Sequence, residues 1–112
     1  MLARESRIRS GADYRQAMKT GIKISGIATV LYLQRDESQT QARFGFIVSK
    51  AVGGAVKRNL IKRRLRSVAR EINSAQPAGY NLVIRALPEA SSFNWNRLQQ
   101  EVLNNAKAAF SK

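Results

Sequence analysis

The chain of 112 residues contains no cysteine and no histidine. It therefore cannot form a disulfide bond, a thiolate nucleophile or a zinc site of the usual Cys/His kind. Long hydrophobic runs are also missing. The longest apolar stretch, residues 27–33, is interrupted by Thr29 and is far shorter than the roughly 20 residues that a membrane helix needs. We therefore expect a cytoplasmic protein with no membrane partner.

Acidic residues are scarce as well. Seven Asp and Glu residues stand against twenty Lys and Arg residues, which gives a formal net charge of +13. Only Asp36 and Glu37 are neighbours, in a polar stretch typical of a turn. A catalytic metal centre made of protein carboxylates is not expected unless folding brings distant acids together. The positive excess favours RNA, DNA or an anionic membrane surface as the partner.

The basic charge is densest in residues 55–72. Helical spacing places the apolar side chains at positions 61, 65, 68 and 72 on one stripe, with basic side chains gathered opposite. No acidic residue lies between Lys57 and Arg70, so like charges repel unless a polyanion neutralises them. This pattern favours a nucleic-acid-binding face over an ordinary solvated helix. The basic residues of the stretch are Lys57, Arg58, Lys62, Arg63, Arg64, Arg66 and Arg70.

Two further helices are predicted near the ends of the chain. Residues 1–10 show no periodicity, so we expect a loosely ordered lead-in before a short helix capped by Asp13 and ending at Lys19. Ser91 and Ser92 offer a cap for a second helix. The apolar residues of that helix with helical spacing, which we expect in the core, are Trp95, Leu98, Val102, Ala106 and Phe110.

Three strands are predicted, over residues 27–33, 43–50 and 80–87, because these stretches are rich in β-branched and aromatic residues. The polar residues 34–41 read as a hairpin-type connection between the first two strands. Gly45 lies in the middle of the second strand, where the absence of a side chain leaves room for another backbone or a ligand. Nothing in the sequence indicates a second domain, so residues 1–112 are treated as one.

One ordered set of motifs resembles a known family. Residues 44–50, Phe-Gly-Phe-Ile-Val-Ser-Lys, are followed by Gly53 and by residues 55–63, Ala-Val-Lys-Arg-Asn-Leu-Ile-Lys-Arg. This block is similar to the protein subunits of bacterial ribonuclease P. The resemblance extends over nearly the whole chain in order. Its outer parts are Arg7-Ile8, Asp13-Tyr14, Gly21, Val30-Leu31-Tyr32 and residues 81–85.

The resemblance implies an α+β domain in which three helices pack on a four-stranded sheet. It also implies a left-handed βαβ crossover through the basic helix, an arrangement found in only about 2% of parallel connections. The family assists a catalytic RNA that removes the 5′ leader from precursor tRNA, with Mg²⁺ held mainly by the RNA. The chain is thus expected to be an endoribonuclease subunit with no catalytic residue of its own. Its expected partners are the catalytic RNA and precursor tRNA, and no protein partner is implied.

The family's functional positions fall on two groups of residues here. The residues expected to line the cleft for the single-stranded leader are Tyr14, Met18, Tyr32, Phe46, Val48, Ser49 and Lys50. Those expected to face the catalytic RNA are Lys57, Arg58, Asn59, Lys62, Arg63, Arg66 and Arg70.

Four positions depart from the family pattern. Leu60 replaces a usual arginine and would be an exposed apolar residue, and Met18 replaces a common aromatic residue. Ala51 stands where a second lysine is usual, and Asn81 stands where an acid is usual. Each change weakens one expected contact without altering the resemblance as a whole.

Other functions remain open from the residues alone. A general RNA-binding or ribosome-associated protein would explain the charge equally well. A membrane-surface helix would explain the basic stripe but not the three strands. A nuclease that acts without RNA has the least support, because the candidate catalytic groups are few.

Overall fold

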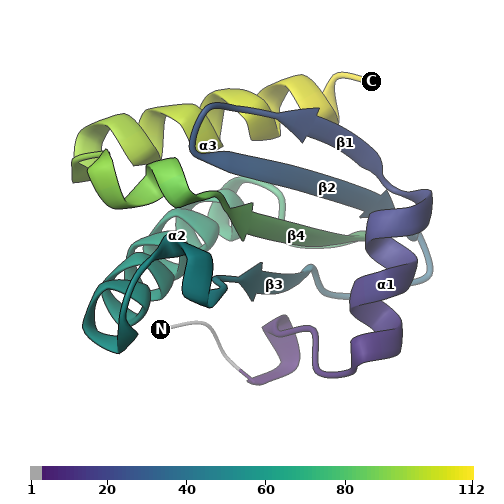
Figure 1. Ribbon diagram of the computed structural model, residues 1–112. Helices are drawn as coiled ribbons and strands as arrows, with labels where there is room; N and C mark the ends of the chain where they lie inside the picture. Colours follow the sequence, from purple (N-terminus) through teal and green to yellow (C-terminus); the bar gives the residue numbers. More distant parts are fainter. Residues whose placement is uncertain (1–3) are drawn as a thin grey trace.

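The computed structural model describes residues 4–112, which form a four-stranded sheet with three α-helices (Figure 1). The strand order in the sheet is β1-β2-β4-β3. In chain order the elements are α1 (Gly11–Thr20), β1 (Ile22–Ser25), β2 (Thr29–Arg35), β3 (Arg43–Ile47), α2 (Ala55–Ala75), β4 (Tyr80–Ala86) and α3 (Trp95–Phe110). Short 3-10 turns lie at Arg4–Ser6, Lys50–Val52 and Pro88–Ser92.

The sheet is mixed. β2 pairs antiparallel with β1 and with β4, whereas β3 pairs in parallel with β4. α2 connects the two parallel strands by passing behind the sheet in Figure 1, which gives the crossover the left-handed sense that the resemblance implied. The predicted hairpin connection at residues 34–41 is wrong, because β4 lies between β2 and β3 and separates them.

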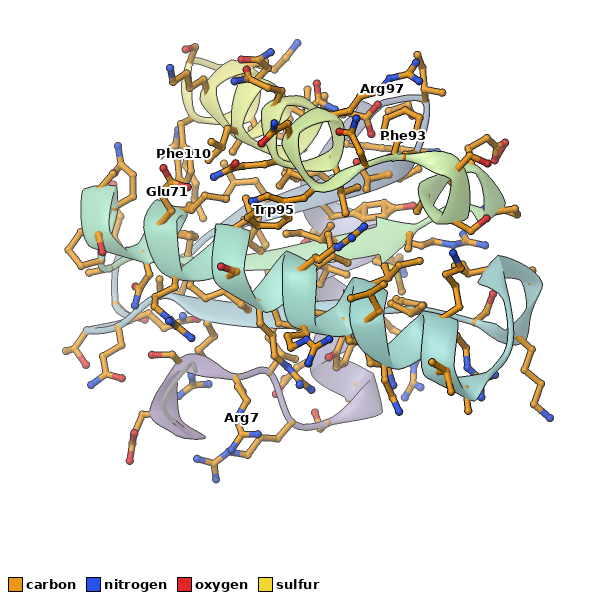
Figure 2. The ribbon with its side chains drawn as sticks, turned by 90° about the vertical axis from the view of Figure 1, so that its left-hand side faces the viewer. Arg7, Glu71, Phe93, Trp95, Arg97 and Phe110 are labelled. Atoms are coloured by element: carbon orange, nitrogen blue, oxygen red, sulfur yellow. The ribbon has the colours of Figure 1, made fainter. Side chains whose placement is uncertain are left out.

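Alternating side chains of the sheet supply two hydrophobic clusters. Leu82 and Ile84 of β4 belong to the main core, which lies between the sheet and the helices α2 and α3. Val83 points to the opposite face, which α1 covers. Of the α3 residues predicted to lie in the core, Leu98, Val102 and Ala106 are buried there. Trp95 and Phe110 are only half-buried and extend toward α2 at the margin of the main core (Figure 2). No helix within residues 4–112 combines the length and the apolar character needed to cross a membrane.

The segment before α1 is ordered where the structure describes it. Ile8 is only 6% exposed, and its N–H donates to the Phe44 carbonyl at 2.9 Å. Arg7 forms an isolated parallel bridge with the same residue of β3. The prediction of a loosely ordered lead-in is therefore wrong for residues 4–10, because the edge of β3 offers backbone groups for pairing. Residues 1–3 lie outside the described part of the chain.

Both predicted caps are displaced by a few residues. Ser10, not Asp13, caps α1, because its Oγ accepts from the Asp13 N–H at 3.0 Å. Asp13 lies in the first turn, where its negative charge interacts favourably with the helix dipole and stabilises the helix. α3 is capped by Asn94, whose Oδ1 accepts from the Arg97 N–H at 2.8 Å. Ser91 is engaged instead in the preceding 3-10 turn, where it donates to the Pro88 carbonyl.

The β1–β2 turn is fastened to α3 by one carboxylate. Glu101 accepts hydrogen bonds from the Ile27 N–H at 2.7 Å, the Ala28 N–H at 3.0 Å and the Thr29 hydroxyl at 2.7 Å. Residues 26–28 therefore form a turn, and the strand predicted to begin at residue 27 begins at Thr29. The short strand β1 was not predicted as a separate element from its own residues.

Tyr80 is a buried polar side chain that the main core depends on. Its ring is 2% exposed and packs edge-on against Phe44 and Phe110, with centroids 5.9 and 4.9 Å away. Its hydroxyl donates to the Gln76 carbonyl just beyond the end of α2. Burial raises the pKa of Tyr80 above its usual value.

We expect Tyr80→Phe to lower the free energy of unfolding at pH 7 by about 1 kcal/mol, since one intramolecular hydrogen bond is lost. The raised pKa means that the native protein favours the protonated phenol. The contribution of Tyr80 to the free energy of unfolding is therefore fully present below about pH 10 and is lost as the pH rises further. The variant lacks this contribution, so the stability difference between the two proteins should stay constant from pH 7 to about pH 9 and shrink as the pH rises from about 10 to about 11. Urea unfolding across this range measures it. A constant difference would contradict the assignment.

Candidate nucleic-acid interface

The basic face of α2 forms an open groove of about 760 Å³. The buried side of the helix, with Ile61, Leu65 and Val68, faces the main core, so the groove lies on the outer side. Five of the seven residues expected to face the catalytic RNA line it together. The complete lining is Val56, Asn59, Leu60, Lys62, Arg63, Arg66 and Arg70.

Lys57 and Arg58, the other two residues expected to face the catalytic RNA, lie outside the groove. Lys57 is on the flank that faces the Pro88–Ser92 turn, where its Nζ donates to the Ser91 carbonyl at 3.4 Å. Arg64 lies two turns further along the same flank, and its guanidinium is 3.5 Å from the Phe93 carbonyl. Arg58 is half-buried and does not line the groove. A role for Lys57 and Arg58 in RNA binding stays a prediction.

The cationic side chains of the groove keep their charge available for a ligand. Within residues 4–112, the side chains of Lys62, Arg63 and Arg66 make no hydrogen bond or ion pair with another residue. The nearest acid along the helix, Glu71, accepts a hydrogen bond from Gln99 of α3 on the other side. Guanidinium groups of this kind match the oxygen geometry of phosphates. The groove is therefore suited to a phosphate backbone.

Two aliphatic residues interrupt the positive charge. Val56 is 87% exposed, and Leu60, one turn later, is half-buried in the same groove. The expectation of an exposed apolar residue thus fits Val56 better than Leu60. Such side chains can contact a base or ribose while neighbouring cations hold the phosphates.

A second, shallow groove of about 550 Å³ lies between α1 and the start of α2, where β3 ends. Three of the residues expected to bind the leader line it: Tyr14, Phe46 and Val48. Lys62 lines both grooves, so the two surfaces are continuous. The other lining residues are Gly11, Arg15 and Ile47.

Gly45 fixes the position of the aromatic ring in this groove. A Cβ atom at Gly45 would lie 2.5 Å from a ring carbon of Tyr14, so any larger residue would displace that ring. The Tyr14 hydroxyl accepts from the Phe46 N–H at 3.2 Å. The space that the sequence indicated at Gly45 is therefore filled by Tyr14 rather than by a backbone or a ligand.

The remaining residues of the expected leader cleft lie around this groove. Met18 and Tyr32 belong to the cluster beneath α1, and Tyr32 is only 8% exposed. Its ring has little surface for stacking, so its role stays a prediction. Ser49 and Lys50 are exposed just after β3. Ile47 was not among the residues expected to line the cleft, although alternation along β3 places it on the same face as Gly45.

The metal-binding capacity of the described residues is limited. Among residues 4–112, no group of three or more His, Cys, Asp and Glu residues is placed to hold a metal ion. What the two joined grooves offer instead is fixed positive charge beside an aromatic and aliphatic surface.

Comparison with known proteins identifies a family. The family model for ribonuclease P matches residues 2–109. The ribonuclease P protein component of Clavibacter michiganensis subsp. michiganensis is 41% identical over 102 residues, covering 91% of this chain and 90% of the relative. That of a Nocardioides species is 41% identical over 104 residues, covering 91% and 89%.

Solved structures agree with this result. The RNase P protein of Staphylococcus aureus is 26% identical, with a TM-score of 0.84 over 93% of this chain and 94% of that one. The protein from Thermotoga maritima has a TM-score of 0.76 over 88% and 92%, and at 22% identity it supports the fold alone. The sequence match and the fold together show that this chain belongs to the ribonuclease P protein family.

Proposed function

We propose that this chain binds the catalytic RNA of ribonuclease P and the 5′ leader of precursor tRNA, and so assists removal of the leader. The observation that supports this most directly is the continuity of the two grooves at Lys62. One groove is suited to a phosphate backbone, and the other combines an aromatic ring with nearby cations. A protein with both surfaces can hold a single strand beside a folded RNA.

The groove at the end of β3 has the composition expected for single-stranded RNA. Bases in single strands stack on aromatic side chains, while cations hold the phosphates between them. Tyr14 supplies a half-buried ring, and Arg15 and Lys62 supply the charge. The leader would lie in this groove, and the catalytic RNA would lie along the outer side of α2.

The protein would contribute binding and positioning rather than bond cleavage. We propose that the Mg²⁺ ions needed for hydrolysis are held mainly by the RNA, as the family resemblance implies. The positive charge of the grooves would then reduce repulsion between the two RNAs, so that fewer Mg²⁺ ions are required. The expected cytoplasmic location belongs to the same proposal.

The decisive test is cleavage of precursor tRNA by a bacterial ribonuclease P RNA at low Mg²⁺, with and without this protein. We expect the protein to restore cleavage at the mature 5′ end. The protein alone, without RNA, serves as the control for a nuclease that acts by itself. Tight RNA binding without restored cleavage would instead favour a general RNA-binding protein.

Arg63→Ala should weaken binding to the catalytic RNA and reduce the slope of log K against log salt by about one unit, because one phosphate contact is lost. Lys107→Ala is the matched control, because it removes one exposed positive charge from α3. Filter binding at several salt concentrations gives both slopes. If the two variants show the same slope as the unchanged protein, Arg63 does not neutralise a phosphate.

Tyr14→Ala should cost about 1–3 kcal/mol of affinity for a substrate that carries a leader, because a base loses its stacking surface. Mature tRNA, which has no leader, should bind the variant and the unchanged protein equally. Thermal unfolding checks that the variant still folds, since Tyr14 packs against Gly45. Equal losses for both RNAs would show that the groove does not hold the leader.

A further inference from the structure

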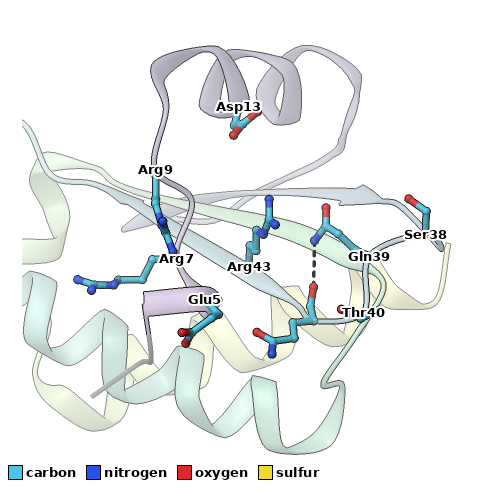
Figure 3. Close-up of a pocket in the computed structure, with 9 residues that line it drawn as sticks. Glu5, Arg7, Arg9, Asp13, Ser38, Gln39, Thr40 and Arg43 are labelled. Atoms are coloured by element: carbon cyan, nitrogen blue, oxygen red, sulfur yellow. Dashed lines mark hydrogen bonds between the residues drawn. The ribbon is translucent and has the colours of Figure 1, made fainter.

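A separate polar pocket of about 520 Å³ lies at the other end of β3 (Figure 3). The segment before α1 forms one wall, and the loop of residues 38–41 forms the opposite wall. Three arginines line it, namely Arg7, Arg9 and Arg43, together with the carboxylates of Glu5 and Asp13. None of these residues belongs to either groove described above.

Both walls of the pocket are held by hydrogen bonds. In the loop, the Asp36 N–H donates to the Gly79 carbonyl and the Ala42 N–H donates to the Pro77 carbonyl, each at 2.9 Å. The opposite wall is fixed where Ile8 pairs with β3. A pocket whose walls are already ordered loses little conformational entropy when a ligand binds.

The charge of the pocket differs in kind from that of α2. Three arginines less two carboxylates leave a net charge of +1, whereas residues 57–70 of α2 contain no acid at all. A long phosphate backbone would be repelled by Glu5 and Asp13. One phosphodiester carries a single negative charge and matches the net charge of the pocket.

Apart from the arginines, the lining holds two carboxylates and the polar side chains of Ser38, Gln39, Thr40 and Gln41. Carboxylates accept hydrogen bonds and cannot donate when ionised. The Gln39 side-chain NH₂ already donates to the carbonyls of Gln41 and Tyr80, each at 3.0 Å, which leaves its Oε1 as an acceptor. Cytosine presents an amino group at C4 to such acceptors, whereas uracil presents a carbonyl oxygen there, which a carboxylate disfavours.

We propose that this pocket binds a single RNA nucleotide, with its phosphate on the arginines and an amino-bearing base against the carboxylates. In Figure 3 the Arg9 and Arg43 side chains lie between Asp13 and Glu5, which places both kinds of group around one space. The inference rests on the proposed function only in taking RNA as the ligand. It adds a nucleotide-selective contact outside the two grooves.

The test compares cytidine 5′-monophosphate with uridine 5′-monophosphate, a pair that differs at the amino group. Titrations followed by backbone amide NMR should show cytidylate binding at least about fivefold more tightly, with shifts at residues 38–43. Inorganic phosphate should bind more weakly than cytidylate. Equal affinity for all three probes would reduce the pocket to a phosphate site and overturn the proposal. Shifts confined to α2 would overturn it as well.

Two substitutions test separately the role of an arginine in holding the phosphate and the role of a carboxylate in selecting the base. Arg43→Gln should weaken the binding of both nucleotides by at least about tenfold, because a charge-assisted hydrogen bond to phosphate is lost. Glu5→Gln should remove the preference for cytidylate and strengthen binding of inorganic phosphate. Lys107→Gln on α3 removes an equal charge outside the pocket and should change the affinity for neither nucleotide. A preference that survives in Glu5→Gln would contradict the role of that carboxylate.

These titrations need no catalytic RNA, so their outcome is independent of the cleavage assay. A protein that restores precursor-tRNA cleavage but does not select cytidylate over uridylate would retain the proposed function and lose this inference. A protein that selects cytidylate but restores no cleavage would show the reverse.

Discussion

The parallel pairing of β3 with β4 is the constraint on which the rest of the structure depends. Two parallel neighbours cannot be joined by a tight turn, so the chain must cross the sheet between them, and α2 is that crossing. Because α2 begins a few residues after β3 ends, its Lys62 comes to lie beside Phe46 and Val48. The continuity of the two grooves is a direct result of this connection.

The second result of this arrangement is a division of labour among the cations of α2. Residues that face α3 or the turn before it, such as Lys57 and Arg64, donate to backbone carbonyls and help to hold that turn. Those on the outer side have no such partner within the described residues. A single basic helix therefore supplies both structural hydrogen bonds and a binding surface.

The sequence predicted correctly those helices and strands that are determined by the apolar pattern of their own residues. The helix expected over residues 55–72 is observed as Ala55–Ala75, and the strand expected over residues 80–87 is observed as Tyr80–Ala86. Both have long, regular apolar patterns that need no knowledge of distant residues. The βαβ crossover, in contrast, came only from the family resemblance.

The predictions that were wrong concern segments whose conformation depends on residues distant in the sequence. The order of residues 4–10 depends on the edge of β3, and the start of β2 depends on Glu101, which lies more than 70 residues away in the sequence. For the candidate site, the sequence predicted the outer face of α2 but not the pocket at residues 38–43. That pocket joins polar segments that show no pattern in isolation and meet only when the sheet has formed.

The clamp made by Glu101 has a consequence for how the molecule folds. The β1–β2 turn is local in sequence, yet its two amides and its hydroxyl find their acceptor only in α3. This contact of high sequence separation closes a loop that contains every strand from β2 to β4, and it carries the entropy cost of that closure. During synthesis, the hairpin must wait for α3 to leave the ribosome before its turn is secured. Completion of the fold is thereby tied to translation of its C-terminal helix.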